Sequence, residues 1–362
     1  MQVGTSFALA VEPNWEDFVA CIMRKKTPQR VHIVELFLDA EIKEAICAGY
    51  DLLEGLRSDD PFLDCQREVR LQRFLGYDYV RCGLDPFEMP LVRSTVTDTA
   101  SLSRKHGRSY MNEQRGPISG WNDFERYPWP DLEKATTRSL EWYERNLPED
   151  MCVIGSGGFA HFAEYLTWLL GYETLCFALY DKRDLVAAIS ERLIKMFTIS
   201  VRRMLEFDRV KLIWGSDDMG FRSGSLIGPK DLREFVFPGH QLMAKAAHLA
   251  GRPYLLHSCG KLTEVMDELI VDVGIDAKHS FEDAIEDVVT AKKRYENRIA
   301  LLGGIDVDFL CRSDPLSIRQ RVLRTLRECM DGGGYCLGTG NSVANYIPLE
   351  NFLTMLDEGR TY

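Results

Sequence analysis

A histidine and a cysteine two residues apart form the sharpest chemical feature of this sequence. His257-Ser258-Cys259-Gly260 directly follows the short apolar run Tyr254-Leu255-Leu256. Alternate residues leaving a strand point the same way, so an imidazole and a thiolate held there could bind one tetrahedral zinc ion. The alternative is a buried histidine that donates to a backbone carbonyl, beside a small apolar cysteine.

A zinc site needs at least three protein ligands, and no Cys-x-x-Cys pair stands near to supply them. The residues that could complete the site are His279, Asp217 or Asp218 and, less favourably, Cys336.

The adjacent carboxylates Asp217 and Asp218 follow Trp214-Gly215-Ser216. Neighbouring carboxylates in an irregular turn usually diverge, so that one caps backbone amides and the other faces the cavity. The second could act as a general base, a metal ligand or a binder of a substrate cation. Two turn-capping aspartates are the alternative.

The elements that must position these residues are short β-rich runs, each followed by a longer helical stretch. This alternation predicts parallel strands joined by crossover helices. The predicted strands cover residues 31–38, 78–82, 151–154, 210–214, 253–257, 276–280, 299–304 and 334–338. Eight such units predict an α/β fold of the (β/α)₈ TIM-barrel type.

Three helices are predicted from clear signals. Residues 229–250 read as a helix broken near Pro238. A stripe of apolar residues from Leu262 to Ile270 predicts another, which Gly274 closes. Ser313-Asp314-Pro315 is an N-cap followed by proline at the first turn of a third.

Residues 86–150 do not fit this pattern, since they are rich in Arg, Ser, Pro and Trp, with hairpin-turn signals at His106-Gly107 and Arg115-Gly116. We interpret them as an insertion after the second strand that caps the barrel mouth of a single domain over residues 1–362. Packing on the outside of the barrel is the alternative.

Barrel enzymes place their sites at the carboxyl ends of the strands, where this sequence carries many polar residues. The predicted substrate-binding residues are Glu35, His161, Trp214, Asp306 and Asn341; the predicted catalytic residues are Asp217, Asp218 and His279; the predicted metal ligands are His257 and Cys259. Glycines at 303, 304, 338 and 340 form no P-loop or dinucleotide fingerprint and are expected to allow tight turns near a ligand.

The composition narrows the class of protein. The net charge of −11 arises from 44 basic and 55 acidic residues without a basic block, which argues against nucleic acid and anionic membranes as partners. No apolar run of 18 residues predicts a membrane span, and the N-terminus lacks a secretory pattern. Ten scattered cysteines indicate a reducing compartment, so we expect a cytoplasmic protein.

Several motifs together resemble the uroporphyrinogen decarboxylase superfamily, which also contains zinc- and corrinoid-dependent methyltransferases. They are His257-Ser258-Cys259-Gly260, Gly303-Gly304-Ile305-Asp306, Leu337-Gly338-Thr339-Gly340-Asn341 and Pro348-Leu349-Glu350-Asn351. The resemblance is specific over residues 205–362 and looser from about residue 14, and it implies the same barrel fold.

Two departures separate this chain from true uroporphyrinogen decarboxylases. Their arginine-rich segment near the first strand, which holds substrate carboxylates, is replaced by Val34-Glu35-Leu36-Phe37-Leu38-Asp39. Thr339 stands where they have a histidine. The methyltransferase branch uses a His-x-Cys pair that matches His257 and Cys259, but its further cysteine falls on Asn341, and Cys336 lies five residues too early.

The resemblance therefore implies a methyltransferase that moves a methyl group between a small substrate and a corrinoid carried by a partner protein, with zinc as a Lewis acid. Asp217 or Asp218 would orient the substrate or give acid–base help. Two alternatives stay open. One is a metal-independent decarboxylase or lyase that uses Asp218, His257 and His279, and the other is a catalytically silent barrel that binds a ligand or a partner.

Overall fold

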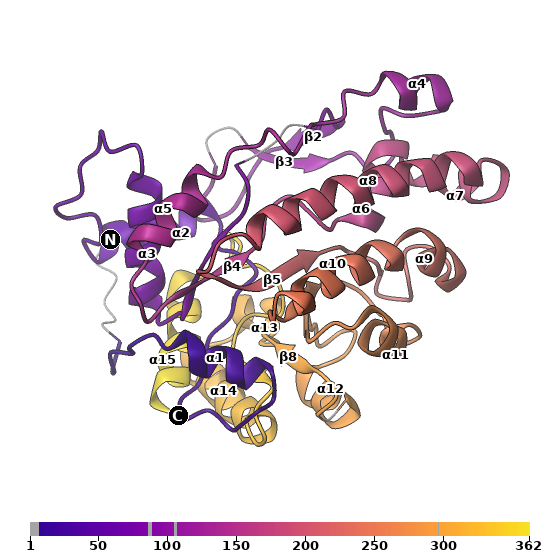
Figure 1. Cartoon of the computed structure of the whole chain (residues 1–362). Coiled ribbons are helices and arrows are strands. Elements are labelled where there is room, and N and C mark those ends of the chain that lie inside the picture. The colour runs from indigo at the N-terminus through magenta and orange to yellow at the C-terminus, as the bar shows by residue number, and fades with distance from the viewer. Residues whose placement is uncertain (1–6, 86–88, 105–106, 296) are drawn as a thin grey trace.

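A curled sheet of seven parallel strands lies at the centre of the computed structural model, which describes residues 7–85, 89–104, 107–295 and 297–362 (Figure 1). The strands follow one another across the sheet in chain order. They are β1 (Tyr79–Cys82), β4 (Cys152–Gly155), β5 (Val210–Ser216), β6 (Tyr254–His257), β7 (Ala277–His279), β8 (Ala300–Leu302) and β9 (Tyr335–Cys336). Seven of the eight predicted strands are therefore present, and the fold is α/β and barrel-like.

Helices cover the outside of the sheet (Figure 1). They are α1 (Trp15–Ile22), α2 (Ala40–Gly49), α3 (Leu63–Leu75), α5 (Arg138–Asn146), α6 (Phe162–Leu170), α7 (Tyr172–Asp181), α8 (Arg183–Met204), α9 (Pro229–Phe235), α10 (Phe237–Leu249), α11 (Met266–Glu268), the π-helical turn η1 (Leu269–Val273), α12 (Val288–Tyr295), α13 (Val307–Arg312), α14 (Pro315–Cys329) and α15 (Leu349–Thr361). The longest, α8, buries Leu185, Ile189, Leu193 and Phe197, an i, i+4 stripe that faces the core.

Two of the three helices predicted from the sequence are confirmed, and the third begins later than predicted. The break predicted near Pro238 lies between α9 and α10, and Asp314 caps α14 by accepting from the amide of Ser317. The helix predicted over 262–270 is wrong at its start, because regular helix begins only at Met266 and widens at once into a π-turn. Leu262 is nevertheless buried. The apolar stripe therefore predicted correctly which residues are buried, but not where the helix begins.

The predicted first strand, residues 31–38, is an extended segment that pairs only at single positions. Ile33 bridges Leu337 and Leu38 bridges Val343, both in the parallel sense. On the side of the segment that faces β1, the backbone amide of Glu35 donates to the hydroxyl of Tyr79 at 3.0 Å. The segment 31–38 is thus joined to β1 through the side chain of Tyr79 and not through a backbone ladder, so it does not form a regular eighth strand. A cavity opens between the two segments.

Between β1 and β4 the chain forms an antiparallel hairpin, β2 (Arg93–Val96) and β3 (Arg108–Met111), followed by α4 (Trp121–Arg126). Residues 86–88 and 105–106 of the predicted insertion, including His106, lie outside the described residues. Arg104 and Arg108 form ion pairs with Asp39, at 2.8 and 3.0 Å. These contacts join the region to the end of the first segment, and the prediction that it caps the barrel mouth stays a prediction.

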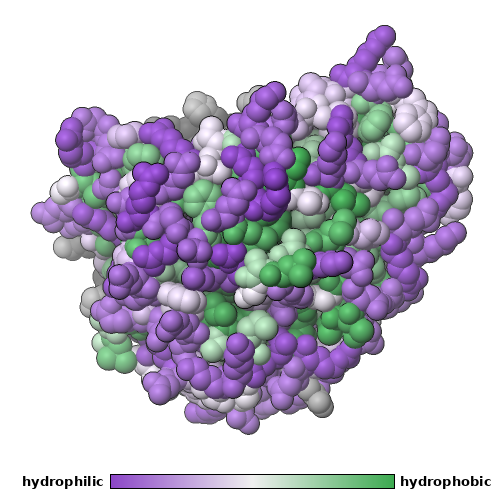
Figure 2. All heavy atoms as spheres, in the orientation of Figure 1, coloured by the Kyte–Doolittle hydropathy of each residue, from purple (hydrophilic) through white to green (hydrophobic). Residues whose placement is uncertain are grey.

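The surface carries mainly hydrophilic residues on the face shown in Figure 2, with apolar residues gathered near its centre. No helix in the described part of the chain is long and apolar enough to span a membrane.

Candidate active site

Three potential metal ligands meet at the carboxyl edge of the sheet, where β5 and β6 end. The ligand atoms of Asp218, His257 and Cys259 all lie within 4.8 Å of one another. Nε2 of His257 is 3.3 Å from Oδ1 of Asp218 and 3.5 Å from Sγ of Cys259. The structure thus brings together both predicted metal ligands and one of the two candidate aspartates.

The strand register and two loop contacts create this cluster. Ser216 of β5 pairs with His257 of β6, and the backbone amide of Cys259 donates to Oδ1 of Asp218 at 2.9 Å. Gly260 has φ +88°, and a Cβ there would lie 2.1 Å from the backbone of Gly220. A glycine is therefore required where the two loops touch.

A chain of hydrogen bonds fixes which nitrogen of His257 carries a proton. Nε2 of His279 is 3.2 Å from the carbonyl of Thr339, which can only accept, so His279 donates there. Burial, reinforced by His257 and Lys278, holds the pKa of His279 far below its usual range. Neutral His279 must then accept at Nδ1, 2.7 Å from Nδ1 of His257, and His257 must donate.

In the neutral ring of His257 the single proton therefore lies on Nδ1. Nε2 carries none, and it faces the carboxylate of Asp218 and the sulfur atom of Cys259. Three electron-rich atoms this close repel one another unless a proton or a metal cation lies among them. Ligands of a tetrahedral zinc ion with bonds of about 2.0–2.3 Å lie about 3.3–3.6 Å apart, which agrees with the two distances from Nε2. The donor set and its spacing therefore fit zinc.

The charges around the cluster are tuned by burial and by close partners. Burial opposes ionisation of Asp218, but when the cation of the cluster is a proton on Nε2 of His257, its hydrogen bond and charge outweigh burial and hold the pKa of this carboxyl below its usual range. Burial and the charge of Asp218 raise the pKa of the Cys259 thiol. The thiol is therefore expected to lose its proton only when a cation replaces it.

Asn341 occupies the fourth side of the cluster. Its Nδ2 is 3.2 Å from Sγ of Cys259, so the residue that stands at the place of the family's further cysteine does reach the predicted metal site. Asn341 was predicted to bind substrate, and that role stays a prediction.

Asp217, the other member of the carboxylate pair, turns away into the protein. It is fully buried and accepts from the amides of Ala163 and Glu164 and from Nε2 of His240, at 3.0–3.1 Å. These contacts show how the pair diverges, with Asp217 holding the start of α6 and Asp218 facing the cluster.

His161 and Glu164 form a titratable pair between the cluster and the neighbouring cavity. Nδ1 of His161 is 2.5 Å from Oε2 of Glu164, which also accepts the amide of Asp218 at 3.2 Å. Burial opposes protonation of His161, but the charge of Glu164 outweighs it and raises the pKa of this histidine.

Asp306 lies apart from the other predicted site residues. Its two carboxylate oxygens accept the amides of Phe309 and Asp283, each at 2.9 Å, and the first contact caps α13. No contact in the described part of the chain joins Asp306 to the cluster, and its predicted role in substrate binding stays a prediction.

Close packing around His279 explains a glycine of the motif loops and the position of Trp214 on β5. Gly303 has φ +77°, and a Cβ there would lie 2.1 Å from the carbonyl of Thr339 and 2.9 Å from Nε2 of His279. The ring of Trp214 packs edge-on against His279, with 5.7 Å between ring centroids. The glycine therefore leaves room for the hydrogen bond that orients the histidine pair.

Glu35 is buried against Thr339 near the cluster. The amide of Thr339 donates to Oε1 at 2.8 Å, and its hydroxyl contacts Oε2 while also lying 2.6 Å from the carbonyl of Asn341. A hydroxyl has one proton, so both contacts are satisfied only when Glu35 is protonated and donates. Burial accordingly raises the pKa of Glu35 to about 8, although the contacts with Thr339 oppose the shift.

The substitution Glu35→Gln is expected to increase stability above pH 5. Between the ordinary pKa of 4.5 and about 8 only the unfolded wild type loses this proton, so its free energy of unfolding falls as the pH rises through that window. The slope attributable to one group is at most about 1.4 kcal/mol per pH unit. Urea unfolding between pH 5 and 8 measures it; parallel curves for wild type and variant would contradict a protonated Glu35. Glu44→Gln, on the exposed face of α2, is the control.

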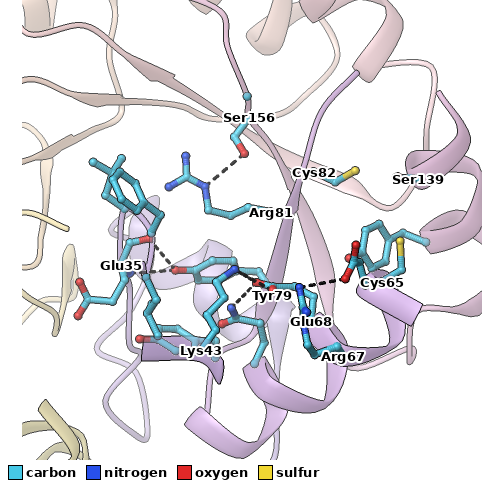
Figure 3. A pocket seen from close by; sticks show the side chains of 18 of the residues that line it. Glu35, Lys43, Cys65, Arg67, Glu68, Tyr79, Arg81, Cys82, Ser139 and Ser156 are labelled. Carbon is cyan, nitrogen blue, oxygen red and sulfur yellow. Dashed lines mark hydrogen bonds and ion pairs between the residues drawn. The ribbon is translucent and has the colours of Figure 1, made fainter. Parts of the chain in front are cut away.

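A cavity of about 560 Å³ opens between the extended segment 31–38, β1 and helices α2, α3 and α5 (Figure 3). Its wall includes the predicted residues Glu35 and His161, and it reaches Ser216, which pairs with His257. It also contains Arg81, which is not among the residues predicted from the sequence. The available signal was a charged residue inside the apolar run Tyr79–Cys82.

A barrel-like α/β fold with this cluster at the carboxyl edge of its strands fits an enzyme. The sequence profile of the uroporphyrinogen decarboxylase (URO-D) family matches residues 114–362, more than half of the chain. The chain therefore belongs to the uroporphyrinogen decarboxylase family. A search of curated proteins finds no match.

Two solved structures are similar to this chain. A methyltransferase from Methanosarcina mazei superposes with a TM-score of 0.65 at 16% identity, and the match covers 95% of this chain and 97% of that one. A protein described as a vitamin-B12-independent methionine synthase from Listeria monocytogenes gives a TM-score of 0.47 at 12% identity, covering 91% and 94%. The first likeness shows the fold alone, and the second is too distant to inform it.

Proposed function

We propose that this protein is a zinc-assisted methyltransferase that exchanges a methyl group between a small substrate and a corrinoid carried by a partner protein. The observation that carries the proposal is the cluster of Asp218, His257 and Cys259, with Nε2 of His257 left bare between a carboxylate and a thiol. Membership of the URO-D family and the fold shared with a methyltransferase support it.

The three clustered residues would hold zinc, which when bound supplies a Lewis acid that lowers the pKa of a thiol or other heteroatom of the substrate. In methyl transfer, the acceptor's lone pair forms a bond to the methyl carbon while the old bond breaks and leaves its electron pair on the departing atom. The acceptor must therefore lose a proton and be held in line with the methyl group.

The other residues of the site would position the substrate and handle its proton. His161 lies on the cavity wall, and its partner Glu164 keeps the pKa of its ring raised, so it can hold a proton that leaves the substrate. His279 orients His257, and Asn341 donates to Cys259. Support for the corrinoid partner comes from the family resemblance alone.

Purified without chelators, the protein is expected to contain about one equivalent of zinc and to transfer the methyl group of methylcobalamin to small thiols. Removing the metal should lower the rate at least about 100-fold, since a Lewis acid contributes several kcal/mol, and added zinc should restore it. Zinc is measured by plasma mass spectrometry and the S-methyl product by mass spectrometry.

Three results would count against this proposal. Zinc below about 0.2 equivalents after reconstitution would exclude the metal site. Turnover that a chelator leaves unchanged would favour a metal-independent lyase. No turnover of any substrate, with no effect of His257→Ala and Asp218→Ala on ligand binding, would favour a silent barrel.

A further inference from the structure

Arg81 projects from β1 into the cavity at the seam of the barrel (Figure 3). Its Nε donates to Oγ of Ser156 at 3.2 Å, and its guanidinium carbon lies 4.4 Å from the centre of the Trp214 ring. Both contacts fix the plane of the guanidinium group. The side chain is thus held in one orientation before any ligand binds.

Within the part of the chain that the structure describes, the guanidinium of Arg81 has no counterion. Its Nη1 is buried without a hydrogen-bond partner, and among the described residues it forms no ion pair. Burial lowers its pKa to about 10, so it stays charged at neutral pH. The residue is half-buried, and a charged group whose buried donor stays empty is costly unless an anion completes it.

The remaining charged groups of the cavity wall do not compensate Arg81. Lys43 pairs with Glu68 at 2.8 Å, and Arg67 pairs with Asp64 at 3.0 Å. Glu35, whose contacts with Thr339 require the protonated form, contributes no charge at neutral pH. In Figure 3, Arg81 extends toward Ser156 and away from Lys43 and Glu68. The cavity therefore has an excess of positive charge at Arg81.

The position of Arg81 links the cavity to the cluster. Its guanidinium stacks on Trp214, Trp214 packs against His279, and His279 bonds to His257. The cavity of about 560 Å³ is large enough for a small organic molecule. The wall of the cavity approaches the cluster at Ser216, which pairs with His257, and at His161, whose partner Glu164 accepts the amide of Asp218. A small ligand bound at Arg81 would therefore extend toward the cluster past these two residues.

We propose that Arg81 binds the carboxylate of the substrate, so that the substrate class is a small carboxylic acid whose methyl-exchanging heteroatom points toward Asp218, His257 and Cys259. The planar fork of a guanidinium matches the two oxygens of a carboxylate. The identification of this ligand as a substrate rests on the proposed function, whereas the anion site itself does not.

The test is a titration of metal-stripped protein with butyrate and benzoate, each beside its uncharged amide, followed by calorimetry and tryptophan fluorescence. At least one carboxylate is expected to bind, and its amide at least about tenfold more weakly. Arg81→Met should weaken carboxylate binding by about 10- to 100-fold, while Arg81→Lys should retain part of it. Arg67→Met, which alters a cation of the same wall already paired with Asp64, should change it less than about threefold.

Several outcomes would overturn the assignment: equal binding of acid and amide, absence of carboxylate binding by the folded wild type, tighter binding of inorganic phosphate, or equal losses in Arg81→Met and Arg67→Met. Circular dichroism and thermal unfolding verify that each variant is folded. Because the titration uses neither zinc nor a methyl donor, its failure leaves the metal site untouched, and a failed methyl-transfer assay leaves the anion site untouched.

Discussion

Replacing Cys259 by alanine is expected to reduce bound zinc from about one equivalent to under about 0.2 equivalents per chain. His257→Ala should have the same effect. Each substitution leaves two of the three clustered donors, whereas zinc sites in proteins use at least three. Methyl transfer should fall with the metal content, at least about 100-fold.

The control for this experiment is Cys336→Ala. Cys336 was the least favoured of the predicted alternatives, and the structure buries it on β9, where its neighbour is Cys21. The variant should retain full zinc content. Loss of zinc from Cys336→Ala but not from Cys259→Ala would refute the proposed set of zinc ligands. Thermal unfolding would show whether replacing the buried Cys336 by the smaller alanine had disturbed the fold.

The strands and their polar ends could be predicted because each depends on local sequence. A buried parallel strand is a short apolar run, and the residue after it falls at the carboxyl edge, which is why His257 and Cys259 were found. The extended segment 31–38 was predicted as a strand for the same reason. Whether it pairs depends on its neighbour, and the intervening ring of Tyr79 is a tertiary feature.

The choice between Asp217 and Asp218 could not be made from sequence. The two differ only in which way the chain turns after β5, and that turn is fixed by distant partners. Asp217 is drawn inward by the amides that begin α6 and by His240, and Asp218 is held by the amide of Cys259. These contacts span 23 to 54 residues along the chain, beyond the reach of any local pattern.

Arg81 was missed for a different reason. A single arginine in an apolar strand is usually a residue at a sheet edge or at the protein surface. Its importance appears only when the charges around it are counted and each of the others proves to be paired or neutral. Sequence reasoning selects residues by type and spacing, and it cannot show that a charge lacks a partner.

The substitution His279→Leu is expected to weaken zinc binding by about 10- to 100-fold without removing a ligand, the usual effect of losing a residue that orients a metal-binding histidine. His279 is fully buried and accepts the Nδ1 proton of His257 while donating to Thr339. Leucine can do neither, so the ring of His257 would be free to turn and to place its proton on Nε2, the atom that faces Asp218 and Cys259.

The matched variant is His279→Gln, whose side-chain oxygen can accept from His257 and whose amide can donate to Thr339. Competition with a chromophoric chelator at pH 7 measures the zinc affinity of both variants. If the role of His279 is to fix the tautomer, glutamine should retain most of the affinity that leucine loses. Equal losses in both would assign His279 to packing against Trp214, and unchanged affinity in His279→Leu would contradict the hydrogen-bond chain altogether.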